Sequence, residues 1–417
     1  MRILIYGINY APELTGIGKY SGEMATWLAA RGHEVRVVTA PPYYPAWNIR
    51  EDYRGKFYRT ERAPGEPTVY RTPLYVPERP TGLKRVAHLA SFMLGSLPVM
   101  LRQAFWQPEI VFTVEPTFFC APIALLVAQA AGASSWLHVQ DFEVDAAFDL
   151  RLLPAHGPTH SLALELERLF TRAFTRVSSI SDTMVERAIT KGVAADRVVL
   201  FPNWVDINSV YPQDGAAANS FRRELGLEGK IILLYSGNMG AKQGLELLAP
   251  LAESFMHDAS VHFLFCGDGA FRPQLETLVA HCHNVTMLPL QPLSRLNDLL
   301  NAADIHLLPQ RAGAADLVMP SKLTGMLSSG RPVIATADGG TQVARVVEGA
   351  DLNEACGLVV PADDAPALQD AVRQLIRDVD LRKQLGSTAR RYAIAHLGRE
   401  QVLERFEQDL QSLITGQ

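Results

Sequence analysis

The sequence predicts an α/β protein built from two domains, each with a parallel β-sheet. A short apolar strand, a glycine-rich loop, a helix and a second strand follow one another over residues 3–39, which is the expected length of a βαβ unit. The same order of strand, glycine-containing loop and helix restarts at residue 230. A chain of 417 residues is also long enough for two or three globular domains.

Composition narrows the class of protein. The formal net charge of −5 and the lack of a lysine- or arginine-rich block argue against a nucleic-acid-binding protein. The four cysteines have no metal-ligand spacing, so we expect small buried thiols in a reduced, cytoplasmic compartment. They are Cys120, Cys266, Cys282 and Cys356. The first residues run directly into an apolar strand, so we expect no signal peptide.

The first predicted loop, residues 7–19, is rich in glycine. Gly16 and Gly18 miss the dinucleotide-binding spacing by one residue, and the Walker pattern is absent. Two interpretations therefore stay open: a tight turn, or a loop whose backbone N–H groups meet a ligand. A helix at 20–30 and a strand at 34–39 are expected to follow.

Residues 41–106 contain two unusual segments. Residues 41–82 are rich in Pro, Tyr and Arg, which is typical of a long functional loop, and acceptor recognition is the role we expect. Residues 83–106 are apolar, but polar residues and Pro98 interrupt them, which argues against a transmembrane helix. An interfacial helix on anionic lipid and a core helix both remain open. The basic residues near the ends of this segment are Lys84, Arg85, His88 and Arg102.

The remaining strands of the two sheets follow from short apolar runs. In the first domain they are expected at 110–114, 135–139, 176–180 and 198–201. In the second they are expected at 230–236, 262–267, 285–288, 304–309 and 358–361, before helices at 369–384 and 388–413. Acids at alternate positions, Asp141, Glu143 and Asp145, also match a divalent-metal site, which we do not favour because the rest of the chain indicates another architecture.

Residues 316–340 are the most informative segment. Pro320 and Ser321 predict the start of a helix, with the Ser321 hydroxyl as its cap, and Gly330 predicts its end. The predicted buried face consists of Leu323, Met326 and Leu327. An apolar strand at 333–335 then opens into Asp338-Gly339-Gly340. Ligands of open α/β sheets bind at such strand ends.

This segment resembles the donor side of retaining glycosyltransferases of family 4, which have the GT-B fold. Pro202-Asn203-Trp204-Val205-Asp206 resembles the motif that closes the first domain in that family, and Cys266-Gly267-Asp268-Gly269-Ala270 resembles its base-pocket glycine motif. Pro320-Ser321-Lys322 matches a subgroup of bacterial exopolysaccharide and O-antigen transferases. The colanic-acid fucosyltransferase type is the closest match and extends over nearly the whole chain.

The resemblance implies a domain organisation and a reaction. Two Rossmann-like domains would face a central cleft: an acceptor domain at 1–205, completed by a C-terminal helix at about 396–417 that crosses back, and a donor domain at 206–395. The enzyme would transfer a hexosyl group with retention, fucosyl from GDP-fucose in the closest match. The acceptor would be a polyprenyl-diphosphate-linked oligosaccharide at the inner face of the cytoplasmic membrane. No metal or other cofactor is implied.

The resemblance also implies site residues. The catalytic candidates are His138, Asp141, Asp316 and Lys322. The donor-binding candidates are Gly16, Gly18, Gly237, Asn238, Lys242, Gly267, Arg311, Pro320, Ser321, Lys322 and Thr324. For His138 and Asp141, a buried and satisfied polar pair is the alternative.

Four positions depart from the family pattern. Two glutamates usually lie eight residues apart, where this chain has Leu317 and Gly325, so Thr324 is the hydroxyl that could hold the donor ribose instead. The usual arginine and lysine of the diphosphate clamp are replaced by Asn238 and Gln243. Negative charge still develops on the leaving diphosphate, and the available cations are Lys322, Arg311 and Lys242.

Two other functions remain open at this point. One is a sugar-nucleotide epimerase of the same fold, and the other is a non-catalytic glycosyltransferase-like subunit that lost donor contacts. No pair of carboxylates with separate roles supports double displacement. Catalysis would therefore rest on orientation and on stabilising the departing diphosphate.

Overall fold

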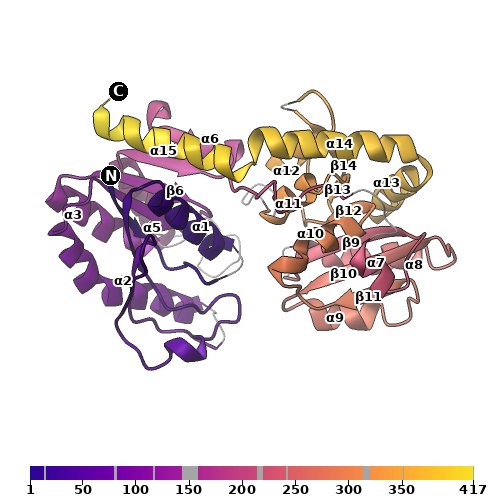
Figure 1. The fold of residues 1–417 in the computed structure, drawn as a ribbon, viewed down its shortest axis with the longest axis horizontal. Coiled ribbons are helices and arrows are strands. Elements are labelled where there is room, and N and C mark those ends of the chain that lie inside the picture. The colour runs from indigo at the N-terminus through magenta and orange to yellow at the C-terminus, as the bar shows by residue number, and fades with distance from the viewer. Residues whose placement is uncertain are drawn as a thin grey trace. The chain divides into compact units, whose positions relative to one another are not determined.

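Figure 1 shows the computed structural model, which describes residues 1–13, 16–78, 82–115, 118–142, 158–213, 219–240, 243–312, 320–350 and 352–416. The chain forms two compact units. The first consists of Met1–Pro202 together with Leu403–Gln417, and the second of Asn203–Val402.

The first unit contains an eight-stranded sheet in the order β3-β4-β2-β1-β5-β6-β7-β8. Its strands are β1 (Arg2–Tyr6), β2 (Glu34–Thr39), β3 (Arg59–Glu61), β4 (Thr68–Arg71), β5 (Ile110–Glu115), β6 (Ser134–Val139), β7 (Arg176–Ser179) and β8 (Val198–Leu200). The pairings are parallel except between β3 and β4. Apolar strands buried on both faces explain the continuous hydrophobic runs in the sequence.

Helices connect these strands, as parallel pairing requires. The helices are α1 (Gly16–Ala30), α2 (Gly82–Ala104), α3 (Ala121–Ala131), α5 (Pro158–Ala173), α6 (Asp182–Thr190) and α15 (Arg399–Thr415). Short 3₁₀ turns lie at η1 (Glu51–Tyr53), η2 (Phe118–Cys120) and η3 (Ala195–Arg197). Ser181 caps α6, because its hydroxyl accepts a hydrogen bond of 3.3 Å from Met184 N.

The end of the chain completes the core of the first unit (Figure 1). Phe406 of α15 stacks on Phe201 with ring centres 4.2 Å apart, and it meets the rings of Phe112 and Trp136 edge-on. Glu407 binds both Arg31, at 2.9 Å, and His33, at 2.7 Å. These contacts hold the terminal helix to a unit whose other residues are Met1–Pro202.

The second unit contains a six-stranded parallel sheet in the order β11-β10-β9-β12-β13-β14. Its strands are β9 (Ile231–Asn238), β10 (Val261–Asp268), β11 (Val285–Leu288), β12 (Ile305–Leu308), β13 (Val333–Thr336) and β14 (Gly357–Val360). Its helices are α7 (Ser220–Glu224), α8 (Leu248–Glu253), α9 (Arg272–Leu278), α10 (Leu296–Ala302), α11 (Lys322–Ser328), α12 (Gln342–Glu348), α13 (Ala365–Arg377) and α14 (Val379–His396). Two 3₁₀ turns, η6 (Leu245–Leu247) and η7 (Leu293–Arg295), complete it.

The predicted division of the C-terminal helices is wrong. Instead of two helices at 369–384 and 388–413, the chain forms α13, α14 and α15. Asp378 separates the first two because its side chain accepts a hydrogen bond of 2.8 Å from Leu381 N and caps α14. Gly386 does not end a helix: a Cβ there would lie 2.3 Å from the Gly330 carbonyl oxygen, so this glycine permits a close backbone contact.

Two glycine segments also differ from the prediction. α1 already begins at Gly16, and β9 extends through Asn238, beyond its predicted end. β9 is longer because Gly237 pairs in register with Gly267 of β10. Both segments that looked like loops therefore belong partly to regular structure.

Two expectations about the chain's environment can be compared with the structure. All four cysteines are buried, which confirms the expectation of small buried thiols. Within the described residues, no helix is long and apolar enough to cross a membrane.

Candidate functional site

The carboxyl ends of β9 and β10 meet at two positions where the backbone requires glycine. Gly237 (φ +133) and Gly267 (φ +154) are register partners in the parallel sheet. A Cβ on Gly267 would lie 1.9 Å from the Gly237 carbonyl oxygen, a distance that no side chain can tolerate. The two strand ends are thus pressed together, and a bare backbone lines the edge where ligands of α/β sheets bind.

Lys322, the first residue of α11, reaches over this glycine edge. A Cβ on Gly237 would lie 3.2 Å from the Lys322 Cδ atom, so the lysine stem occupies the space that Gly237 leaves. The Lys322 ammonium nitrogen lies 4.2 Å from the centre of the Tyr235 ring. This nitrogen is buried and forms a hydrogen bond with none of the described residues. A buried ammonium without hydrogen bonds is costly, so the position is suited to an anionic ligand.

Electrostatics at Lys322 agree with this geometry. Burial lowers the pKa of Lys322 to about 7. The ring of Tyr235 offers the ammonium a cation–π contact but no acceptor. Burial raises the pKa of Tyr235, whose hydroxyl donates a hydrogen bond of 2.6 Å to the Asn238 carbonyl. Lys322 can therefore change its charge near neutral pH when an anion arrives.

The loop after β9 contains a second unpartnered polar atom. The side-chain oxygen of Gln243 is buried and accepts no hydrogen bond from the described residues. A Cβ on Gly240 would lie 2.9 Å from that oxygen and 3.3 Å from the Asn238 amide nitrogen. Asn238 and Gln243, which replace the usual cations, therefore both approach Gly240. A carboxamide oxygen suits a hydroxyl or N–H donor rather than a phosphate.

The other predicted donor residues of the second unit have mixed surroundings. Arg311 is half exposed and pairs with Glu246 at 2.7 Å. Unlike Lys322, it therefore already has an anionic partner. Pro320 precedes α11, and Ser321 stands at its N-cap position without a capping hydrogen bond, contrary to the prediction. Thr324 is buried, and its hydroxyl donates a hydrogen bond of 2.9 Å to the Ser321 carbonyl. The Thr324 hydroxyl oxygen can still accept a hydrogen bond from a ligand, but its proton is already donated to Ser321.

In the first unit, His138 lies at the end of β6 within an aromatic core. It is 3% exposed and stacks on Phe112 with ring centres 5.8 Å apart. Nδ1 is 2.9 Å from the Ser178 hydroxyl, and Nε2 is 2.9 Å from the Gln140 amide nitrogen. Burial lowers the pKa of His138 to about 3, so its ring is neutral. Asp141 follows β6 and is half-buried.

The glycine segment of the first unit is explained largely by packing. Gly16 (φ +60) begins α1. A Cβ on Gly18 would lie 2.6 Å from an oxygen of the Glu13 carboxylate. That buried carboxylate accepts hydrogen bonds from the backbone N–H groups of Tyr43, at 3.1 Å, and Tyr44, at 3.0 Å. Burial raises the pKa of Glu13. Glu13 thus ties the glycine segment to the proline- and tyrosine-rich segment, and a ligand-binding role of Gly16 and Gly18 stays a prediction.

The structure brings together some predicted residues and not others. Within the second unit, Gly237, Asn238, Gly267 and Lys322 gather at one strand edge. His138 and Asp141 belong to the first unit. Asp316 and Lys242 lie outside the described residues, as do Glu143 and Asp145 of the metal-site alternative.

Sequence reasoning missed two residues of the second unit. The ring of Tyr235, on β9, makes the cation–π contact with the Lys322 ammonium. Gln310 lies two residues after β12, and its buried side-chain oxygen has no partner in the described part of the chain. Gln310 stands against Gly244, where a Cβ would lie 3.1 Å from the Gln310 carbonyl carbon. The position of Gln310 after a predicted strand could have identified it from the sequence. The sequence does not show toward which residue the Tyr235 ring points.

Comparison with known proteins defines the class. Two family models match in succession: a glycosyl transferase 4-like domain over residues 15–204 and a glycosyl transferases group 1 domain over residues 230–378. Among solved structures, sucrose-phosphate synthase of Thermosynechococcus elongatus superposes with a TM-score of 0.74 at 20% identity, covering 100% of this chain and 99% of that one. Anabaena HepE in complex with UDP-glucose superposes with a TM-score of 0.67 at 15% identity, covering 99% and 100%. The fold is that of the GT-B glycosyltransferases.

A curated relative places the chain more closely. The putative colanic acid biosynthesis glycosyl transferase WcaI of Escherichia coli K12 is 42% identical over 415 residues, which is 98% of this chain and 100% of that protein. The chain therefore belongs to the family 4-like, group 1 glycosyltransferases, and it is an enzyme of that kind. The family resemblance found in the sequence is confirmed.

Proposed function

We propose that this glycosyltransferase moves a hexosyl group, with retention, from a nucleotide diphospho-sugar to a lipid-linked oligosaccharide in bacterial exopolysaccharide biosynthesis. The relative of 42% identity is named for colanic acid biosynthesis, which supports this pathway class. Fucosyl from GDP-fucose is the specific donor we propose, and it rests on the resemblance to colanic-acid fucosyltransferases. Retention rests on the same resemblance.

The observation that carries the donor proposal is the unpartnered ammonium of Lys322. It is aimed at a glycine-lined strand edge, where a diphosphate can approach the backbone. Breaking the bond between sugar and phosphate develops negative charge on the leaving diphosphate. A buried cation placed there stabilises that charge more strongly than a solvated one would.

This arrangement gives a reason for the lost arginine and lysine of the usual diphosphate clamp. Asn238 and Gln243 stand in their places, and Lys322 enters the same edge from α11 instead. We propose that Lys322 supplies the charge that the clamp supplies elsewhere, and that transfer proceeds without a metal ion or other cofactor. His138 and Asp141 remain the proposed contacts to the transferred sugar or the acceptor hydroxyl.

Peripheral membrane association on the inner face of the cytoplasmic membrane is the second part of the proposal. Helix α2 exposes large apolar side chains at helical spacing: Leu83 (84% exposed), Val86 (38%), Leu94 (62%) and Leu101 (43%), with Phe105 (90%) directly after it. We call this row the apolar stripe. Besides the buried His88, α2 holds the cations Lys84, Arg85 and Arg102, and it has no acidic residue. An apolar stripe on a purely cationic helix fits an anionic lipid surface.

The donor proposal is tested by thermal shift of the purified enzyme against GDP, UDP, ADP, dTDP and their sugars. We expect a selective rise in the melting temperature with GDP and GDP-fucose, and no rise in the Lys322→Met variant. A shift with another nucleotide would correct the base and leave the transferase proposal standing. No shift with any nucleotide would contradict it.

The epimerase alternative needs its own measurement. Incubation of the enzyme with the bound nucleotide sugar and no acceptor should give slow hydrolysis, with the released sugar in the retained configuration by NMR. Free interconversion of two nucleotide sugars would instead identify an epimerase.

A further inference from the structure

A groove of about 390 Å³ lies in the first unit, between the edge strands β3 and β4 and the C-terminal half of α2. Among the described residues, its lining includes three arginines, Arg59, Arg71 and Arg102, and no carboxylate. The groove belongs to the first unit, whereas the glycine edge belongs to the second.

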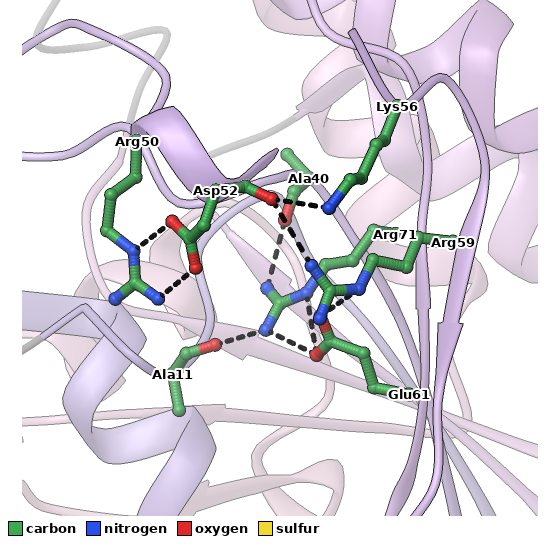
Figure 2. Close-up of polar contacts among 8 residues, drawn as sticks. All are labelled: Ala11, Ala40, Arg50, Asp52, Lys56, Arg59, Glu61 and Arg71. Carbon is green, nitrogen blue, oxygen red and sulfur yellow. Dashed lines mark hydrogen bonds and ion pairs between the residues drawn. The ribbon is translucent and has the colours of Figure 1, made fainter. Parts of the chain in front are cut away.

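The arginines of the two strands are held in place by a shared network (Figure 2). Arg71 is almost fully buried and donates hydrogen bonds to the carbonyls of Ala11 and, at 3.0 Å, Ala40. Its guanidinium also pairs with Glu61 at 3.2 Å. Arg59 pairs with the other oxygen of Glu61 at 3.3 Å. One carboxylate thus serves two guanidinium groups, so positive charge remains in excess along this wall.

The surroundings of the network do not neutralise that excess. Asp52 is engaged by Arg50 through two hydrogen bonds of 2.6 Å. The Asp52 carbonyl accepts from Lys56 at 2.9 Å, which brings a further cation next to Arg59 (Figure 2). The network thus joins four cations, Arg50, Lys56, Arg59 and Arg71, and two carboxylates, Asp52 and Glu61.

Arg102, on the opposite wall, differs from the strand arginines. It lies in the last turn of α2 and is exposed, and its guanidinium forms no hydrogen bond or ion pair with a described residue. Planar guanidinium groups bind phosphate oxygens in pairs, which a lysine cannot do. An unengaged arginine that faces two anchored ones is suited to an anionic group between them.

The groove borders the apolar stripe. Pro98 and Val99 of α2 form part of its lining, and Arg102 immediately follows Leu101 of the stripe. The Tyr58 hydroxyl donates a hydrogen bond of 3.2 Å to the Gly95 carbonyl and so fixes the strand wall against the helix. A molecule with an anionic head in the groove could therefore lay an apolar chain along α2.

We propose that this groove binds the phosphate or diphosphate group of an amphiphile, with Arg102 as the cation that engages it and Arg59 and Arg71 as the fixed opposite wall. This inference rests on the proposed function, because it assigns the groove to the lipid-linked acceptor. The same chemistry would hold a free diphosphate, so the test separates the two sources.

The test compares wild type, Arg102→Gln and a matched control, Lys84→Gln. Lys84 is an exposed cation on the same helix that does not line the groove. Binding is measured by co-sedimentation with phosphatidylcholine vesicles doped either with a polyprenyl diphosphate or with phosphatidylglycerol at equal surface charge. We expect Arg102→Gln to weaken binding to the diphosphate vesicles about tenfold, while binding to the phosphatidylglycerol vesicles changes about twofold or less. Lys84→Gln should affect both vesicle types equally.

A second arm uses inorganic pyrophosphate without vesicles. A rise in melting temperature that Arg102→Gln removes would show that the groove recognises a diphosphate in solution as well. Equal loss on both vesicle types in Arg102→Gln, or no loss on either, would overturn the proposal. The nucleotide-induced thermal shift should persist in Arg102→Gln. If that shift is intact and the vesicle assay does not show the selective loss, the groove proposal is refuted and the donor proposal stands.

Discussion

His138 of the first unit and Lys322 of the second both lie at the carboxyl edge of a parallel sheet, but their surroundings are opposite. His138 has partners at both ring nitrogens, 2.9 Å away, and aromatic rings around it. Lys322 has an aromatic ring below its ammonium and no hydrogen-bond partner among the described residues. Burial lowers the pKa of both groups, to about 3 for His138 and to about 7 for Lys322.

The different surroundings of His138 and Lys322 show how a perturbed pKa should be interpreted. A shift caused by burial occurs in structural and functional residues alike. Satisfied hydrogen bonds identify a group that stabilises the fold, whereas a missing partner identifies a group that awaits a ligand. By this criterion Lys322 is the stronger candidate for donor binding, and His138 must first be tested for a structural role.

The largest expected effect is that of Gly267→Ala. A Cβ at this position would lie 1.9 Å from the Gly237 carbonyl oxygen, at a φ of +154. We expect a loss of about 3 kcal/mol or more in the free energy of unfolding, because two backbones would have to separate. Urea unfolding measures it, with Gly339→Ala as the control, since no atom lies within 4 Å of a Cβ there. A stable Gly267→Ala variant would show that the strand edge is not as tight as described.

Lys322→Met should come next. We expect nucleotide diphosphate affinity to fall about 100-fold, which corresponds to about 2.7 kcal/mol, the range of a buried charge-assisted contact. Calorimetric titration measures it, with the exposed Lys383→Met on α14 as the control. Stability should not fall: the folded-state pKa of Lys322 lies below its unfolded value, so the buried ammonium is least favourable at low pH. The gain in melting temperature from Met should therefore be larger at pH 6 than at pH 9.

His138→Ala tests the other side of the comparison. Removing the ring leaves a cavity and two unpaired polar groups, so we expect about 2 kcal/mol of destabilisation and no change in nucleotide affinity. Stability and affinity are measured on the same protein. His138→Gln, which can keep one hydrogen bond, separates the roles: restored stability with turnover still lost would establish His138 as a catalytic residue, and restoration of both would establish a structural one.

The smallest expected effect is the pH dependence of donor affinity. Lys322, with a pKa of about 7, must take up a proton to meet a diphosphate at higher pH. Affinity should therefore fall about eightfold between pH 7.5 and 8.5, a range in which the phosphate itself is already ionised. Lys322→Arg keeps its charge throughout and should bind with little pH dependence. The same slope in both proteins would assign the proton to another group.

Much of the fold could be predicted because its determinants are local. The strands at 34–39 and 285–288 were predicted with their observed bounds, since short apolar runs between turn residues specify them. Gly330 was likewise predicted at the end of a helix, and it has the left-handed conformation that suits this position. The helix break at Asp378 was missed because Gly386, a more conspicuous glycine, is explained only by the distant Gly330 carbonyl.

The candidate site likewise has features that could be predicted from the sequence and features that could not. The class of protein could be predicted from consecutive residues, as could Gly237 and Gly267 at strand ends and Lys322 at a helix start, because motif order and element position are local properties. That Gly267 touches Gly237, that Tyr235 lies under Lys322, and that no hydrogen bond from the described residues reaches the Lys322 ammonium became known from the structure. Burial and missing partners depend on which distant segments meet, and such contacts leave no periodicity in the sequence.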